Sequence, residues 1–102
     1  MIHVIATIEV APGKRAEFLA EFAQVVPPVR AEAGCIEYGA AVDVPTGLAA
    51  QPPVRPDTVT VVEKWADVPA LQAHLAAPHM VTYRQRVAGL VKSVTLQVLQ
   101  PA

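Results

Sequence analysis

The chain of 102 residues contains one cysteine, Cys35, and no asparagine. A single cysteine excludes an intramolecular disulfide and a metal site built from several cysteines, and Cys35 is expected to act as a small hydrophobic residue. No apolar run reaches the roughly 18 residues that a membrane span requires, and the first residues lack the pattern of a signal peptide. We therefore expect a cytoplasmic protein without a membrane partner.

The chain also lacks an excess of either charge. Its formal net charge is −1 and its basic residues are spread out, so nucleic acid is not expected as a partner. The length fits a single domain spanning residues 1–102. Hydrophobic residues make up 53% of the chain, above the usual share of about 45–50%. A domain this small cannot bury all of them in its own core, so the remaining apolar surface should be buried against an identical subunit. We expect a homodimer.

Hydrophobic periodicity divides the chain into six elements. A period of two predicts strands, and a period near 3.6 predicts helices. Asp67 is a predicted N-cap, Pro27 and Pro28 predict a kink or restart in the first helix, and Pro78 predicts a restart in the second. The elements are a strand over 2–10, a helix from Lys14 to near Gly34, strands over 35–44 and 58–65, a helical segment from 67 to about 92, and a strand over 93–100.

The order β, α, β, β, α, β predicts an α+β, ferredoxin-like fold with both helical segments on one face of the sheet. The other face is left bare. There, His3, Thr7 and Glu9 of the first strand, or else Thr95 and Gln97 of the last, interrupt the apolar residues. A dimer that closes two such faces would leave a pocket for a small amphipathic molecule.

The segment from Pro45 to Asp57 is longer than a hairpin needs and is rich in proline. We expect a stiff arm that packs on the partner subunit or over the pocket mouth. A tolerated surface insertion is the alternative.

None of the strong catalytic motifs is present, but a polar cluster follows the third strand: Glu63, Trp65, His74 and His79. An apolar stripe of Val68, Leu71 and Leu75 puts His74 at the margin of the buried helix face. His79 follows Pro78 at a helix start, where the helix dipole favours a neutral ring. Each histidine has a structural alternative, as a hydrogen-bonded packing residue. Trp65 is either core or a stacking wall, and Glu63 is either solvated or a polar anchor.

Several segments in this order resemble the antibiotic biosynthesis monooxygenase family along nearly the whole chain. They are Pro12-Gly13-Lys14, the run from Arg30 to Tyr38, Glu63-Lys64-Trp65, the run from Ala70 to Leu75, and Pro78-His79. The resemblance implies a dimeric α/β barrel. It also implies oxidation of quinols or polycyclic phenols by molecular oxygen, with no cofactor and no metal.

The chain departs from the family pattern in two respects. Anthrone-oxidising members and the haem-degrading branch each use an asparagine near the pocket, and this chain has none. In the haem-degrading branch a tryptophan takes the place of His74 and the axial histidine falls near Arg84, so haem degradation is not expected. An oxyanion partner would have to come from His74, His79, Arg84 or a backbone amide.

We therefore predict a cofactor-independent monooxygenase with His74 or His79 as proton acceptor and Arg84 as charge stabiliser. Trp65 and Tyr38 are the predicted pocket walls. A non-catalytic module that binds a small molecule is the main alternative, and an isomerase or lactone-handling enzyme on the same fold is the third. The remaining predicted substrate-binding residues are Glu63, His3 and Tyr83.

Overall fold

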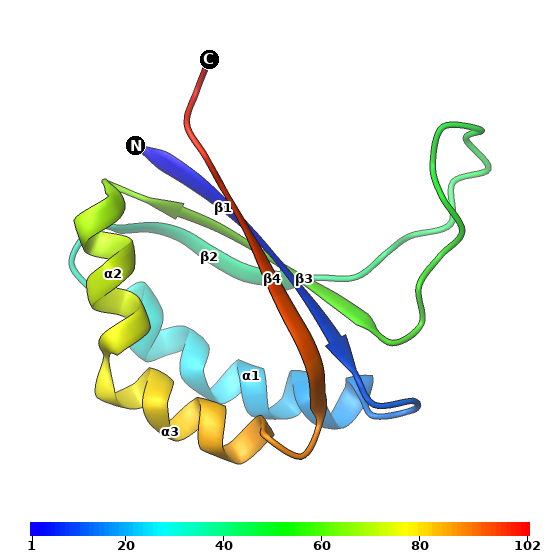
Figure 1. The fold of residues 1–102 in the computed structure, drawn as a ribbon, viewed down its shortest axis with the longest axis horizontal. Coiled ribbons are helices and arrows are strands. Elements are labelled where there is room, and N and C mark those ends of the chain that lie inside the picture. Colours follow the sequence, from blue (N-terminus) through cyan, green and yellow to red (C-terminus); the bar gives the residue numbers. More distant parts are fainter.

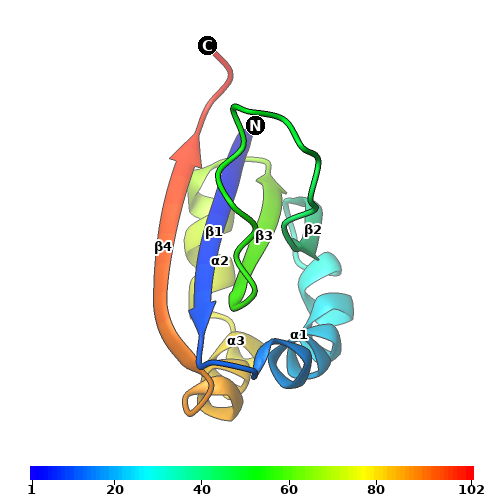
Figure 2. The ribbon, with the colours of Figure 1, turned by 90° about the vertical axis from the view of Figure 1, so that its right-hand side faces the viewer.

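The computed structural model describes residues 1–102 as a four-stranded sheet with helices on one face (Figure 1). The strand order is β2-β3-β1-β4 with every neighbouring pair antiparallel, and Figure 2 shows the strands side by side in that order. This confirms the ferredoxin-like βαββαβ fold. The elements are β1 (Ile2–Val10), α1 (Arg15–Arg30), β2 (Cys35–Ala41), β3 (Thr58–Trp65), α2 (Val68–Ala76), α3 (Pro78–Val87) and β4 (Val91–Leu99).

The core forms where the apolar face of the sheet meets α1 and α3. Strand β1 alternates as predicted, and its even-numbered residues are buried while the odd-numbered ones lie on the bare face. Helix α1 contributes one apolar stripe at helical spacing. Its buried members are Phe18, Phe22, Val25 and Val29.

Several predicted boundaries differ from the structure. Strand β2 ends at Ala41 rather than Val44, and β4 spans Val91–Leu99 rather than 93–100. Helix α1 ends at Arg30, short of Gly34, and it continues through Pro27 and Pro28 as one helix without a restart. The two prolines lie in the last turn of the helix. Each proline removes one backbone N–H donor, but only two or three residues follow, so the helix can end there without a break.

The second helical segment divides as predicted, because the residue before Pro78 is disfavoured in the helical region and Ala77 is extended. Asp67 caps α2 by accepting a hydrogen bond from the Ala70 amide at 2.9 Å. The predicted apolar stripe is wrong, because Val68 and Leu75 are exposed whereas Leu71 and His74 are buried. The helix is thus rotated so that His74 faces the core.

The loop between β2 and β3 extends away from the helices (Figure 1). Arg55 binds Asp43 through two nitrogens, at 2.8 and 2.9 Å, and thereby ties the two ends of the loop together. No residue of this loop lines the cavity described below, so the loop does not cover the pocket within one subunit. None of the helices combines the length and the hydropathy needed to cross a membrane.

Candidate active site

A cavity of about 240 Å³ lies between the sheet and the helices. Side chains from all four strands and all three helices line it, and ten of the thirteen lining residues are hydrophobic. The other three are Glu63, His74 and Arg84. A few polar groups in an apolar cavity are what orient a small ligand. Tyr38 and Tyr83 also line the cavity, so five of the predicted site residues are brought together here.

Glu63 lies on β3, in register with Val4 of β1 and Tyr38 of β2. Its side chain is buried and lines the cavity, so it is not a solvated strand residue, and its role as a polar anchor for a ligand stays a prediction. Its Oε1 accepts a hydrogen bond from the indole Nε1–H of Trp65 at 2.9 Å. Burial raises the pKa of this carboxyl, and the bond from Trp65 and the nearby His74 offset only part of the effect.

His74 is fully buried, and both of its ring nitrogens face carboxylates. Nδ1 lies 2.9 Å from Oε2 of Glu32, and Nε2 lies 4.0 Å from Oε1 of Glu63. An ionised carboxylate can only accept, so Nδ1 carries the hydrogen that bonds to Glu32. In the neutral ring, Nε2 is then the proton acceptor, and it is oriented toward the Glu63 side of the site.

Trp65 supports this pair without lining the cavity. Its ring lies against the His74 imidazole, with ring centroids 4.6 Å apart, and its only hydrogen-bond donor is used by Glu63. Because its ring is buried and both of these contacts are made inside the protein, Trp65 positions the polar pair. The predicted role as a wall that stacks directly on a substrate finds no support in this placement.

His79 and Glu32 lie behind His74 and do not line the cavity. His79 Nε2 is 2.8 Å from the same Glu32 oxygen that accepts from His74, so one carboxylate connects the two predicted histidines. Sequence reasoning missed Glu32. It follows α1 in a short turn, and nothing in its local pattern separates it from a solvated surface glutamate.

Tyr38 and Tyr83 contribute neutral hydroxyl groups to the site, because burial raises the pKa of both phenols far above physiological pH. Their rings pack against Phe22, with Tyr38 stacked on it and Tyr83 edge-on. Arg84 donates a hydrogen bond to the Leu75 carbonyl at 2.7 Å. A guanidinium has five N–H groups, so Arg84 keeps donors for a ligand in the cavity.

His3 is not brought to this cavity. It lies on β1 between Lys64 and Leu99 in the register, on the sheet face opposite the helices. Its part in ligand binding stays a prediction that depends on a partner subunit. No group of three or more His, Cys, Asp or Glu side chains is arranged to hold a metal ion.

Comparison with known proteins shows what this chain is similar to. The family model described as antibiotic biosynthesis monooxygenase matches residues 1–86. A protein of Escherichia coli K12 described as "Probable quinol monooxygenase YgiN" is 39% identical over 103 residues, covering 99% of this chain and 98% of that protein.

Two solved structures show the same fold at high coverage. PA3566 from Pseudomonas aeruginosa has a TM-score of 0.80 at 28% identity, with 99% of this chain and 93% of that chain covered. SO0527 from Shewanella oneidensis has a TM-score of 0.74 at 31% identity, with 97% and 92% covered.

Proposed function

Because this chain belongs to the antibiotic biosynthesis monooxygenase family, we propose that it is a cofactor-independent oxidoreductase that uses O₂ to oxygenate a quinol or another phenolic compound. The observation that carries the proposal is the buried His74, which has a carboxylate at each ring nitrogen and lies at the wall of an apolar cavity. A quinol and O₂ together give a hydroxyquinone and water. The substrate supplies all four electrons, so the reaction needs no other reductant.

The chemical difficulty of this reaction lies in the spin state of O₂. Oxygen is a triplet and reacts slowly with closed-shell molecules, but a phenolate readily gives it one electron. The protein therefore has to remove the phenolic proton and hold the anion in place beside O₂. Nε2 of His74 is the acceptor in this proposal, with general base catalysis worth roughly 10²–10⁴-fold in rate.

The surroundings of His74 favour the charged products of that proton transfer. Glu32 and Glu63 stabilise the imidazolium from both sides, at 2.9 and 4.0 Å. The free donors of Arg84 and the neutral hydroxyls of Tyr38 and Tyr83 are available to the phenolate oxygen. Such preorganised dipoles and charges act more strongly beside apolar side chains than in water.

The size of the cavity limits the substrate. An apolar cavity of about 150 Å³ binds benzene, so about 240 Å³ has room for one or two fused aromatic rings. A small aromatic molecule is thus the ligand that fits within one subunit. A large polycyclic phenol would need the cavity to open along β4, where Val94 and Leu96 line it while still partly exposed.

The proposal extends to a homodimer. Sheet residues facing away from the helices have no layer over them, and only 20 of 102 residues are buried in the single subunit. A second copy placed against this face would form the α/β barrel implied by the sequence resemblance, and it would cover Ile5 and His3.

Replacing His74 tests the proposal. We expect His74→Gln, which retains a polar side chain but is a poor base, to slow oxygen uptake with a panel of one- and two-ring quinols by about 10²–10⁴-fold. The matched control is Gln72→Ala on the solvent side of α2, and thermal melting verifies that both variants fold.

Two results would contradict the proposal. If His74→Gln oxidises quinols within a few-fold of wild type, the base lies elsewhere. If wild type gives no uptake above autoxidation across the panel while still binding the quinols, the protein is a small-molecule binding module.

A further inference from the structure

The side chains behind the cavity form a continuous chain of hydrogen bonds from the interior to the surface. Oε2 of Glu32 lies within hydrogen-bond distance of both histidines, 2.9 Å from Nδ1 of His74 and 2.8 Å from Nε2 of His79. The exposed fraction of the side chains rises along this chain, from 2% for His74 through 13% for Glu32 to 29% for His79. Every link is short enough for proton transfer along a hydrogen bond.

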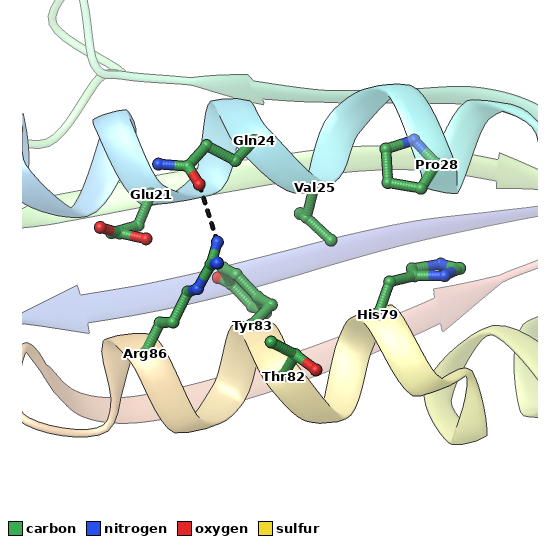
Figure 3. A pocket seen from close by; sticks show the side chains of 8 residues that line it. All are labelled: Glu21, Gln24, Val25, Pro28, His79, Thr82, Tyr83 and Arg86. Atoms are coloured by element: carbon green, nitrogen blue, oxygen red, sulfur yellow. Dashed lines mark hydrogen bonds between the residues drawn. The ribbon is translucent and has the colours of Figure 1, made fainter.

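The outer end of the chain opens into a second hollow, separate from the cavity. This hollow has a volume of about 190 Å³ and lies between α1 and α3, where Figure 3 shows His79 on α3 facing Pro28 on α1. Most of its lining residues have polar or charged groups, although most of its lining surface is apolar. Arg86 spans the hollow by donating a hydrogen bond to Gln24 at 2.7 Å. Glu21 on α1 adds a carboxylate with one buried oxygen that has no partner. Water that fills such a hollow can take up a proton.

We propose that His74, Glu32 and His79 form a proton relay that carries the phenolic proton from the cavity to the hollow between α1 and α3. The inference rests on the proposed monooxygenase function. It assigns a role to Glu32 and separates the two histidines, with His74 as the catalytic base and His79 as a relay residue.

The transfer conserves protons at each step. Nε2 of His74 takes the substrate proton while Nδ1 of the same ring gives its own to Oε2 of Glu32. The Glu32 carboxyl passes its proton to Nε2 of a His79 ring that carries its own hydrogen on Nδ1, and that Nδ1 hydrogen passes to water. When the oxygen–oxygen bond breaks, Nε2 of His74 gives its proton to the leaving oxygen, which becomes water. A proton then returns along the same chain to Nδ1 of His74, so each ring regains its starting charge and tautomer.

The relay answers a difficulty that burial creates. His74 has almost no contact with solvent, and the cavity beside it is mostly apolar, so the cavity itself offers few groups that could take a proton from an imidazolium formed there. The charged and titratable groups facing it are Glu63 from β3, Tyr38 from β2 and Glu32 from the turn after α1. Of these, Glu32 is the one that is also bonded to a partly exposed group.

Buffer dependence tests the relay. We expect His79→Ala to lower turnover in dilute buffer by about 10-fold, less than the roughly 10²–10⁴-fold effect of losing the base itself, because water can carry part of the proton flow. Added imidazole should restore the rate of His79→Ala in a saturable manner, while wild type stays insensitive to imidazole. Thr82→Ala, which changes another residue of the same hollow, is the matched control.

Glu32→Gln separates a relay from a structural role. Its amide can accept a hydrogen bond from one histidine but cannot pass on a proton, so its turnover should fall and should not recover with imidazole. If His79→Ala loses no activity, or if its loss is insensitive to imidazole, the proton leaves by another route and the proposal is overturned.

A measurement without substrate distinguishes failure of the relay from failure of the proposed function. NMR exchange of the His74 Nδ1–H with solvent should slow by about 10-fold in His79→Ala if protons pass along this chain, in proportion to the expected loss of turnover. Wild type without quinol oxidation but with this slowing would contradict only the proposed function. Unchanged exchange would overturn the relay whether or not the protein oxidises quinols.

Discussion

At the scale of single residues, Glu63 is where stability and function conflict. A buried carboxyl whose pKa is raised above its ordinary value of 4.5 binds its proton more tightly in the folded than in the unfolded chain. The folded state is therefore penalised as pH rises above 4.5, and the penalty is complete above the native pKa. Each pKa unit of the shift is worth about 1.4 kcal/mol at high pH.

We predict that Glu63→Gln stabilises the protein at pH 8. The amide oxygen keeps an acceptor for the Trp65 indole, and the variant carries no buried charge. The melting temperature should rise by about 4–8 °C for each kcal/mol by which the variant lowers the burial penalty, and this rise should disappear as the pH approaches 4.5. Turnover should fall because the imidazolium of His74 loses a neighbouring anion.

Glu37→Gln on β2 is the matched control, because Glu37 is exposed and pairs only with Lys64 across the surface. Such pairs contribute little, so its melting point should change little at either pH. A Glu63→Gln variant that melts below wild type at pH 8 would show that the charge is better stabilised than its burial implies.

The sequence predicted the residue types of the site better than their orientation. Tyr38, Glu63, His74, Tyr83 and Arg84 do meet in one cavity. His74 was expected at the helix margin because three apolar residues suggested a different buried face. In a helix of nine residues, three apolar residues are too few to determine which face of the helix turns toward the core. The inward-facing His74 instead contacts Glu32 and Trp65. These contacts join residues distant in sequence, which a local pattern cannot reveal.

At the scale of elements, the turn from α1 into β2 holds α2 close to the sheet. Gly34 has a φ of +83°, and a Cβ there would lie 2.7 Å from the Cβ of Ala70 on α2. The Ala66 amide also donates to the Gly34 carbonyl at 2.8 Å. This turn therefore sets how closely the start of α2, and with it His74, approaches the strands.

We predict that Gly34→Ala destabilises the protein by about 2–5 kcal/mol, the sum of a left-handed backbone strain and an overpacked contact. Gly13→Ala is the control, because Gly13 has a similar φ of +75° but nothing within 4 Å of an added Cβ. Urea unfolding measures both. Equal losses in the two variants would mean that α2 moves aside at little cost.

The sequence predicted all the elements but placed some of their ends too far along the chain. Alternation continues through Val42 and Val44, which are exposed, but the pairing of β2 with β3 stops at Ala41 opposite Thr60. Strand β3 has two further residues beyond Thr60, Val59 and Thr58, but they pair with β1 alone. The point at which a strand leaves its partner is not contained in the local pattern.

At the scale of the whole molecule, one face of the sheet is uncovered and β4 is an edge strand with exposed Val94, Leu96 and Val98. Both features favour a second copy, because an unpaired apolar edge is otherwise prone to aggregation. We predict a homodimer at micromolar concentration by light scattering.

Ile5→Lys should convert the dimer to a monomer, since it puts a charge at the centre of the uncovered face between Val62 and Gln97. Gln85→Lys on the exposed side of α3 adds the same charge away from this face and should leave the mass unchanged. A wild-type mass equal to the 10.8 kDa of one chain would contradict the dimer.

Oxygenation of a quinol with isotopically labelled O₂ tests the central claim most directly. With ¹⁸O₂, purified wild type and no flavin, nicotinamide or added metal, the hydroxyquinone should gain one labelled oxygen, and one O₂ should be consumed for each quinol. His74→Gln should show this labelling only at the background rate. An unlabelled product, or hydrogen peroxide formed in equal amount to the quinone, would contradict the proposal that this chain is a monooxygenase.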